Sequence, residues 1–176
     1  MRRRATKIRE PPRLKDMTKT QVIKVLRVRK MLKALLILSI IFVYVEDATT
    51  YLSLNLRKDI VEVGTTVLFI NMFGLEFGIL LSFLIVFTLA FLFYYAALHW
   101  LPKREENLTS RRIFRLSFIG LTSLCFGLFP SACNDTLGLL FGYAPLGSLD
   151  PLSRYFFSLI IVAIGAVTAL IIEGKL

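Results

Sequence analysis

The amino-acid sequence predicts an all-α, polytopic membrane protein: a four-transmembrane-helix bundle with a basic cytoplasmic N-terminal tail and a short outer half-helix. The 176 residues are 56% hydrophobic, include fifteen Phe and have a mean hydropathy of +0.68, well above the composition of soluble domains. Four stretches also supply the about 20 predominantly apolar residues that a helix needs to cross about 30 Å of hydrocarbon. The predicted spans are 31–54, 75–100, 113–140 and 151–172.

The tail, residues 1–30, precedes the transmembrane domain, residues 31–176. It holds twelve Lys and Arg against Glu10 and Asp16, whereas the basic and acidic residues of the rest balance, so the net charge of +10 lies in the tail. Thr18–Gln21 fits a capping box and predicts an amphipathic helix. Because Lys and Arg concentrate on the cytoplasmic side of membranes, we expect the tail there, as a topology anchor alone or bound to anionic lipid or an acidic subunit. Nucleic acid is disfavoured because no aromatic residue is interleaved with the basic ones.

Span one, 31–54, is expected to be retained, because Glu46-Asp47-Ala48-Thr49-Thr50 offers no small-residue cleavage site. The following apolar stretch, Val63 to Trp100, is too long for one crossing. We therefore predict that Gly64 to Gly74 forms an outer half-helix or re-entrant segment, broken at Gly74, and that span two begins at Leu75.

Punctuation residues mark the other spans. His99–Pro102 ends span two, Thr109 or Ser110 can cap span three, Pro130 predicts a kink, and Asp150-Pro151 opens span four. The loop before span three is basic, which places it with the tail and predicts a multi-pass cell-membrane protein with both termini cytoplasmic. Small residues on spans three and four predict close helix contact, within the chain or between chains; they include Ser117, Gly120, Ser123, Gly127, Ala163, Gly165, Ala166 and Ala169.

Acidic residues inside or beside the spans form the candidate site, because ionisable groups in a membrane are costly. The topology gathers them at the outer side, and no Lys or Arg occurs between residues 34 and 56, 59 and 102, or 116 and 153. Such oxygen groups suit Ca²⁺, Mg²⁺, Na⁺ or a proton, and Thr49 or Asn71 could add a neutral oxygen. The predicted cation or proton site comprises Glu46, Asp47, Thr50, Glu76, Asn134 and Asp135.

Other roles for these acids stay open. They could pair with Arg57, Lys58 or Arg154 as a salt-bridge network at the rim, or one acid could face a partner subunit. A protease-like pair of Asp47 and Asp135 is disfavoured, because neither lies in a Gly-flanked loop. His99 is the single histidine, which leaves no ligand set for zinc and no Ser-His-Asp arrangement. No cofactor is predicted.

Short motifs give a resemblance. Asp47-Ala48-Thr49-Thr50-Tyr51, then Glu62, then a late Asn134 resemble an uncharacterised family of small four-helix prokaryotic membrane proteins with an Asp-x-x-Thr motif in span one. The resemblance covers about residues 32 to 140 and implies four helices and an outer polar site. Val63-Gly64 stands where the family has Asn-Pro, and Glu76 lies where the family tends toward a basic residue.

Together these features predict a non-enzymatic integral membrane protein. We interpret it as an accessory or structural subunit of a larger membrane assembly, with the lipid bilayer and protein subunits as partners. The alternative is a small cation- or proton-binding transport protein that uses the outer carboxylates.

Overall fold

The protein is all-helical in the computed structural model, which describes residues 19–56, 65–103, 107–142, 145–149 and 151–174. Within these ranges there is no strand. The elements are α1 (Lys19–Leu56), α2 (Thr65–Phe73), α3 (Leu75–Trp100), α4 (Leu108–Phe141), the 3-10 turn η2 (Pro145–Ser148) and α5 (Pro151–Gly174).

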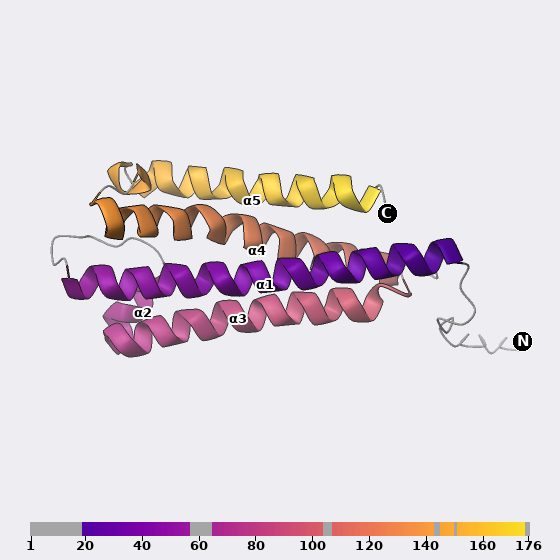
Figure 1. Ribbon diagram of the computed structural model, residues 1–176, viewed down its shortest axis with the longest axis horizontal. Helices are drawn as coiled ribbons and strands as arrows, with labels where there is room; N and C mark the ends of the chain where they lie inside the picture. The colour runs from indigo at the N-terminus through magenta and orange to yellow at the C-terminus, as the bar shows by residue number, and fades with distance from the viewer. Residues whose placement is uncertain (1–18, 57–64, 104–106, 143–144, 150, 175–176) are drawn as a thin grey trace, which may run out of the picture.

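The four long helices lie side by side along one axis (Figure 1). Helix α4 is central, because it contacts α1, α3 and α5, while α1 also contacts α3. We call the end that carries α2 and η2 the hairpin end, and the opposite end, where α1 begins and α5 finishes, the basic end (Figure 1, left and right).

Three of the helices, α3, α4 and α5 from Leu152, are long and apolar enough to cross a membrane. The predicted first span, in α1, is not among them. Its uncharged apolar run extends only from Ala34 to Val45, shorter than the about 20 residues that a lipid-facing span needs. Lys33 bounds this run on one side, and Glu46 and Asp47 bound it on the other.

Helix α1 joins the predicted tail helix and span one without a break. Val25 and Val28, from the predicted tail, are buried with Leu101 and Phe114 in the apolar core of the basic end. The boundary drawn at residue 30 therefore falls inside a packed helix. The predicted capping box lies outside the described part, which includes neither Thr18 nor the side chains of residues 19–21.

The α2–α3 hairpin confirms the break predicted at Gly74. Gly74 has φ 84° and ψ 167°, a backbone conformation that glycine adopts most readily. After Gly74, α3 folds back along α2. A Cβ at Gly78 would lie 2.5 Å from Ile70 backbone atoms, and the Thr66 and Ser82 hydroxyl oxygens are 3.1 Å apart. The hydroxyl groups of Thr66 and Ser82 therefore satisfy each other where α2 packs on α3.

Helix α4 begins earlier than predicted, and its cap is Asn107 instead of Thr109 or Ser110. Asn107 has extended backbone angles, and its Oδ1 accepts a hydrogen bond from Ser110 N at 2.7 Å, which satisfies a first-turn N–H. The helix continues through Pro130 and ends where Gly142 adopts a left-handed φ of 69°. Helix α5 begins at Pro151, as predicted, whereas Asp150 lies outside the described part.

Small residues set the spacing of α4 against its neighbours, as predicted. A Cβ at Gly165 would lie 2.9 Å from Ser123 Cα and 3.0 Å from Phe126 Cβ, so α5 approaches the backbone of α4. Ser123 Oγ also donates a hydrogen bond to the Val162 carbonyl at 3.3 Å. Close approach thus joins backbone contact to an interhelical hydrogen bond.

Candidate functional site

The buried face of α1 changes from apolar to polar along the helix. Its buried positions recur three or four residues apart, which is the spacing of one helix face. From the basic end to the hairpin end this stripe comprises Val25, Val28, Leu32, Leu36, Ser39, Val43, Asp47, Thr50 and Ser53, and Thr49 is buried beside it. The apolar core therefore occupies the basic end, and polar side chains replace it toward the hairpin end.

Polar residues of α4 meet the polar half of α1 in what we call the polar seam: Glu46, Asp47 and Thr50 of α1 with Ser131, Asn134 and Asp135 of α4. Ser131 Oγ donates a hydrogen bond to Glu46 Oε1 at 2.8 Å. This hydrogen bond joins residues far apart in the chain and links one carboxylate of α1 directly to α4.

A second set of contacts lies further along α4. The Thr50 side chain lies beside the Asp135 carboxyl group, and Asn134 Nδ2 donates a hydrogen bond to Asp135 Oδ1 at 3.0 Å. Asn134 Oδ1 accepts from Leu146 N at 2.7 Å, which ties the seam to η2. Asn134 thus uses both ends of its amide and fixes its own orientation.

Asp47 is the most enclosed acid of the seam, with 5% of its surface exposed. It lies between Glu46 and Thr50 on α1 and belongs to the same buried stripe. Thr49 is also buried, but its hydroxyl donates to the Val45 and Glu46 carbonyls of its own helix at 2.7 and 2.9 Å. Thr49 therefore satisfies itself locally and adds no donor across to α4.

The structure does not bring all of the predicted site residues together. Glu76 and Asn71 lie at the hairpin end, as expected, but both are exposed. The level of Glu76 along α3 agrees with the prediction, whereas the rotation of α3 leaves its side chain exposed. Across the described ranges, no group of three or more His, Cys, Asp or Glu is placed to hold a metal ion. The predicted set therefore reduces to the α1–α4 seam.

The basic partners proposed for these acids are only partly described. Arg57 and Lys58 lie outside the described residues. Arg154, on α5, donates from Nε to the Leu149 carbonyl at 2.8 Å, so part of its guanidinium group binds the backbone before α5.

Sequence reasoning missed two polar residues. One is Ser131, which precedes Asn134 and Asp135 by one helical turn, a spacing that could have placed it in the seam. The other is Glu173 near the end of α5, whose side chain is 9% exposed. Its position opposite the Arg residues that open α4 was a signal, because antiparallel neighbours bring those two ends together.

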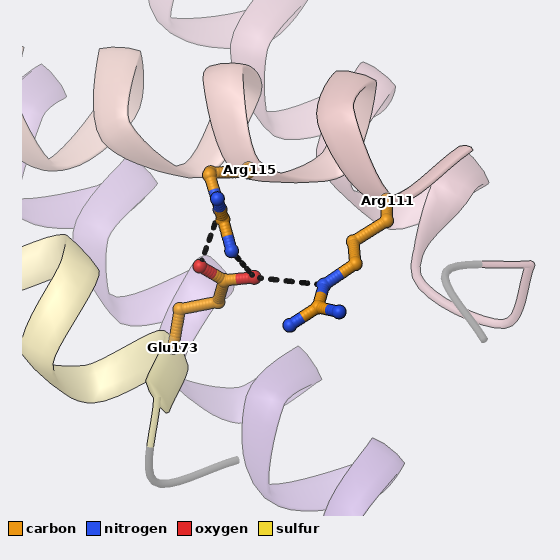
Figure 2. A network of polar contacts seen from close by, with 3 residues as sticks. All are labelled: Arg111, Arg115 and Glu173. Atoms are coloured by element: carbon orange, nitrogen blue, oxygen red, sulfur yellow. Dashed lines mark hydrogen bonds and ion pairs between the residues drawn. The ribbon is translucent and has the colours of Figure 1, made fainter. Parts of the chain in front are cut away.

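Glu173 accepts two hydrogen bonds from Arg115 at the basic end (Figure 2). The distances are 2.7 Å from Nε to Oε2 and 3.2 Å from Nη2 to Oε1. Arg111 Nε lies 3.9 Å from Oε1, and its side chain is 60% exposed. The two-pronged contact fixes the end of α5 to the start of α4, while Arg111 adds a weak outer contact.

Comparison with known proteins gave no match: no protein-family model, curated protein or solved structure matches this chain. The resemblance to small four-helix prokaryotic membrane proteins therefore stays a prediction.

Proposed function

We propose that this chain is a non-enzymatic, four-span integral protein of the cell membrane that serves as an accessory subunit of a larger membrane assembly. The observation that carries the proposal is the poor coverage of α5 by its own chain. Only 12% of its most apolar stretch is buried, and its main contact is with α4. Such an apolar helix surface is covered by lipid or by another subunit.

The polar seam supports α1 as the fourth span. Helix α1 extends alongside α3 and α4 from one end of the bundle to the other (Figure 1). Its Glu46 and Asp47 would be too costly against lipid, but Asp47 is buried and Glu46 binds Ser131 of α4. A helix that keeps its acids against a neighbour can span with a shorter lipid-facing run.

Charge supports the orientation that we propose, with both termini in the cytoplasm. At the basic end, the described Lys and Arg lie on α1 from Lys24 to Lys33, at Lys103, and on α4 from Arg111 to Arg115. At the hairpin end, the described charges are Glu46, Asp47, Glu76, Asp135 and Arg154. An excess of basic residues marks the cytoplasmic side.

Gentle purification tests the subunit role. We expect the full-length chain, solubilised from its native membrane in mild detergent, to migrate with other subunits at a mass above its own 20.0 kDa. Mass spectrometry of the band identifies these subunits. The same purification of a Gly165→Val variant, designed to loosen α4 from α5, provides the comparison. A stable isolated monomer or homodimer under the same conditions would contradict the proposal.

The polar seam favours a second candidate, a small cation- or proton-binding transport protein. Glu46 and Asp135 accept hydrogen bonds from hydroxyl or amide groups, and Asp47 is buried beside them in an apolar bundle, where a carboxylate needs a proton, a cation or a positive partner. Because the described residues form no metal-type group, a proton is the better-suited ion.

Thermal unfolding separates the two candidates. If the seam binds an ion, the melting temperature of the wild type is expected to change with added Na⁺ or Ca²⁺, or with pH. The variants Asp47→Asn and Asp135→Asn are expected to remove that dependence. Glu76→Gln is the matched control, because Glu76 is exposed and outside the seam. Equal melting of wild type and variants across all conditions would exclude the ion-binding role.

A further inference from the structure

Basic residues of three helices form a belt at one level of the bundle. Val28 and Leu32 of α1 share an apolar core with Leu101 and Phe114, so α1 positions 27–33 lie level with the end of α3 and the start of α4. We define the basic belt by the residues at this level outside the Glu173–Arg115 pair: Arg27, Arg29, Lys30, Lys33, Lys103, Arg111 and Arg112.

The outward face of α1 changes character at the belt. Arg27, Lys30 and Lys33 are exposed, and the exposed positions that follow toward the hairpin end are apolar: Ala34, Ile37, Leu38 and Ile41. Charged residues thus give way to apolar ones along one helix face, as expected where lipid headgroups meet hydrocarbon.

Trp100 marks the same level on α3. Lys103 Nζ lies 5.1 Å from the centre of the Trp100 ring and 3.3 Å from His99 Nε2. Tryptophan is enriched at the headgroup level of membrane proteins, so the aromatic position agrees with the charge boundary on α1.

Positive charge exceeds negative charge at this level. Among the described residues, Glu173 is the acid of the basic end, and Arg115 already takes both of its oxygens. Arg29 Nε is buried and has no hydrogen-bond partner within the described part of the chain. The exposed guanidinium groups of Arg27 and Arg112 fit an anion with several acceptor oxygens, and phosphate is such an anion.

We propose that the basic belt binds the phosphodiester headgroups of anionic phospholipids in the leaflet at the basic end. The belt joins Arg27, Arg29 and Lys30 of the predicted tail to basic residues at the end of α3 and the start of α4, and the packed helices hold it at a fixed level. Lipid is favoured over a soluble anion because apolar side chains adjoin the belt on its hairpin side and can contact the acyl chains. The inference is independent of the accessory-subunit role.

The test measures thermal unfolding of the full-length protein in detergent. Added phosphatidylglycerol is expected to raise the melting temperature more than phosphatidylcholine with the same acyl chains. Removing three exposed charges in R27Q/K30Q/K33Q is expected to weaken the apparent affinity for phosphatidylglycerol by about a hundredfold. The matched control, R27K/K30R/K33R, keeps the charges and is expected to respond like the wild type.

Native mass spectrometry of the wild type supplies a second measurement that does not require the variant to fold. Bound phosphatidylglycerol is expected to persist in excess phosphatidylcholine and to be lost at about 1 M salt, where charges are screened beyond about 3 Å. Equal stabilisation by both lipids, an unchanged response of the glutamine variant, or full reproduction of the effect by inorganic phosphate would overturn the proposal.

Discussion

At the scale of single residues, the contact between Glu173 and Arg115 is the most specific tie between α4 and α5. The carboxylate is nearly buried, whereas 41% of the Arg115 side chain remains exposed. Partial exposure lowers the value of an ion pair through solvent screening, but two charge-assisted hydrogen bonds retain part of it. Arg111 contacts the same carboxylate only at 3.9 Å.

We predict that Glu173→Gln lowers the free energy of unfolding by about 1–2 kcal/mol, because hydrogen bonds to a charged group are weakened and Arg115 loses its counter-charge. Denaturation in mixed micelles measures the change. The control, Arg111→Gln, removes an exposed arginine from the same carboxylate and is expected to cost less than about 0.5 kcal/mol. Equal losses in both variants would contradict the geometry in Figure 2.

At the scale of elements, the α4–α5 contact depends on a glycine at one crossing point. Gly165 allows α5 to approach Ser123 and Phe126 so closely that a side chain there would meet atoms at 2.9 and 3.0 Å. Gly127, on the facing helix, has more room: its nearest neighbour would be Val162 Cγ2 at 3.4 Å. The two glycines therefore allow a tightly packed position to be compared with a roomier one.

We predict that Gly165→Val destabilises the bundle by about 1–3 kcal/mol, because the backbone of α4 cannot yield as a flexible side chain would. Gly127→Ala is expected to stay within about 0.5 kcal/mol of the wild type. Unfolding curves of both variants in one detergent give the comparison. Tolerance of valine at 165 would show that α5 packs differently.

Local sequence signals predicted the helix ends better than the contacts between helices. Gly74 and the His99–Pro102 segment gave the bounds of α3, because turn residues act locally. The cap of α4 was assigned two or three residues late, since Asn107, Thr109 and Ser110 can all cap a helix and only the backbone distinguishes them. Glu76 and Ser131 show the remaining limit: helix rotation decides which residue enters the seam, and rotation depends on tertiary packing.

At the scale of the whole molecule, the two ends of the bundle differ in both core and surface. The basic end combines an apolar core with a positively charged surface, and the hairpin end combines a polar seam with acidic residues. The central claim is that α1, whose uncharged run is short, crosses the membrane because its acids lie against α4. The two ends of α1 are therefore expected on opposite sides of the membrane.

Single-cysteine labelling at the two ends of α1 tests this claim most directly. After Cys125 and Cys133 are replaced by Ala, Ile23→Cys and Asn55→Cys each place one thiol at an exposed position. In intact cells, a membrane-impermeant maleimide is expected to label Asn55→Cys at once and Ile23→Cys only after permeabilisation. Labelling of both thiols from the same side would contradict a membrane-spanning α1.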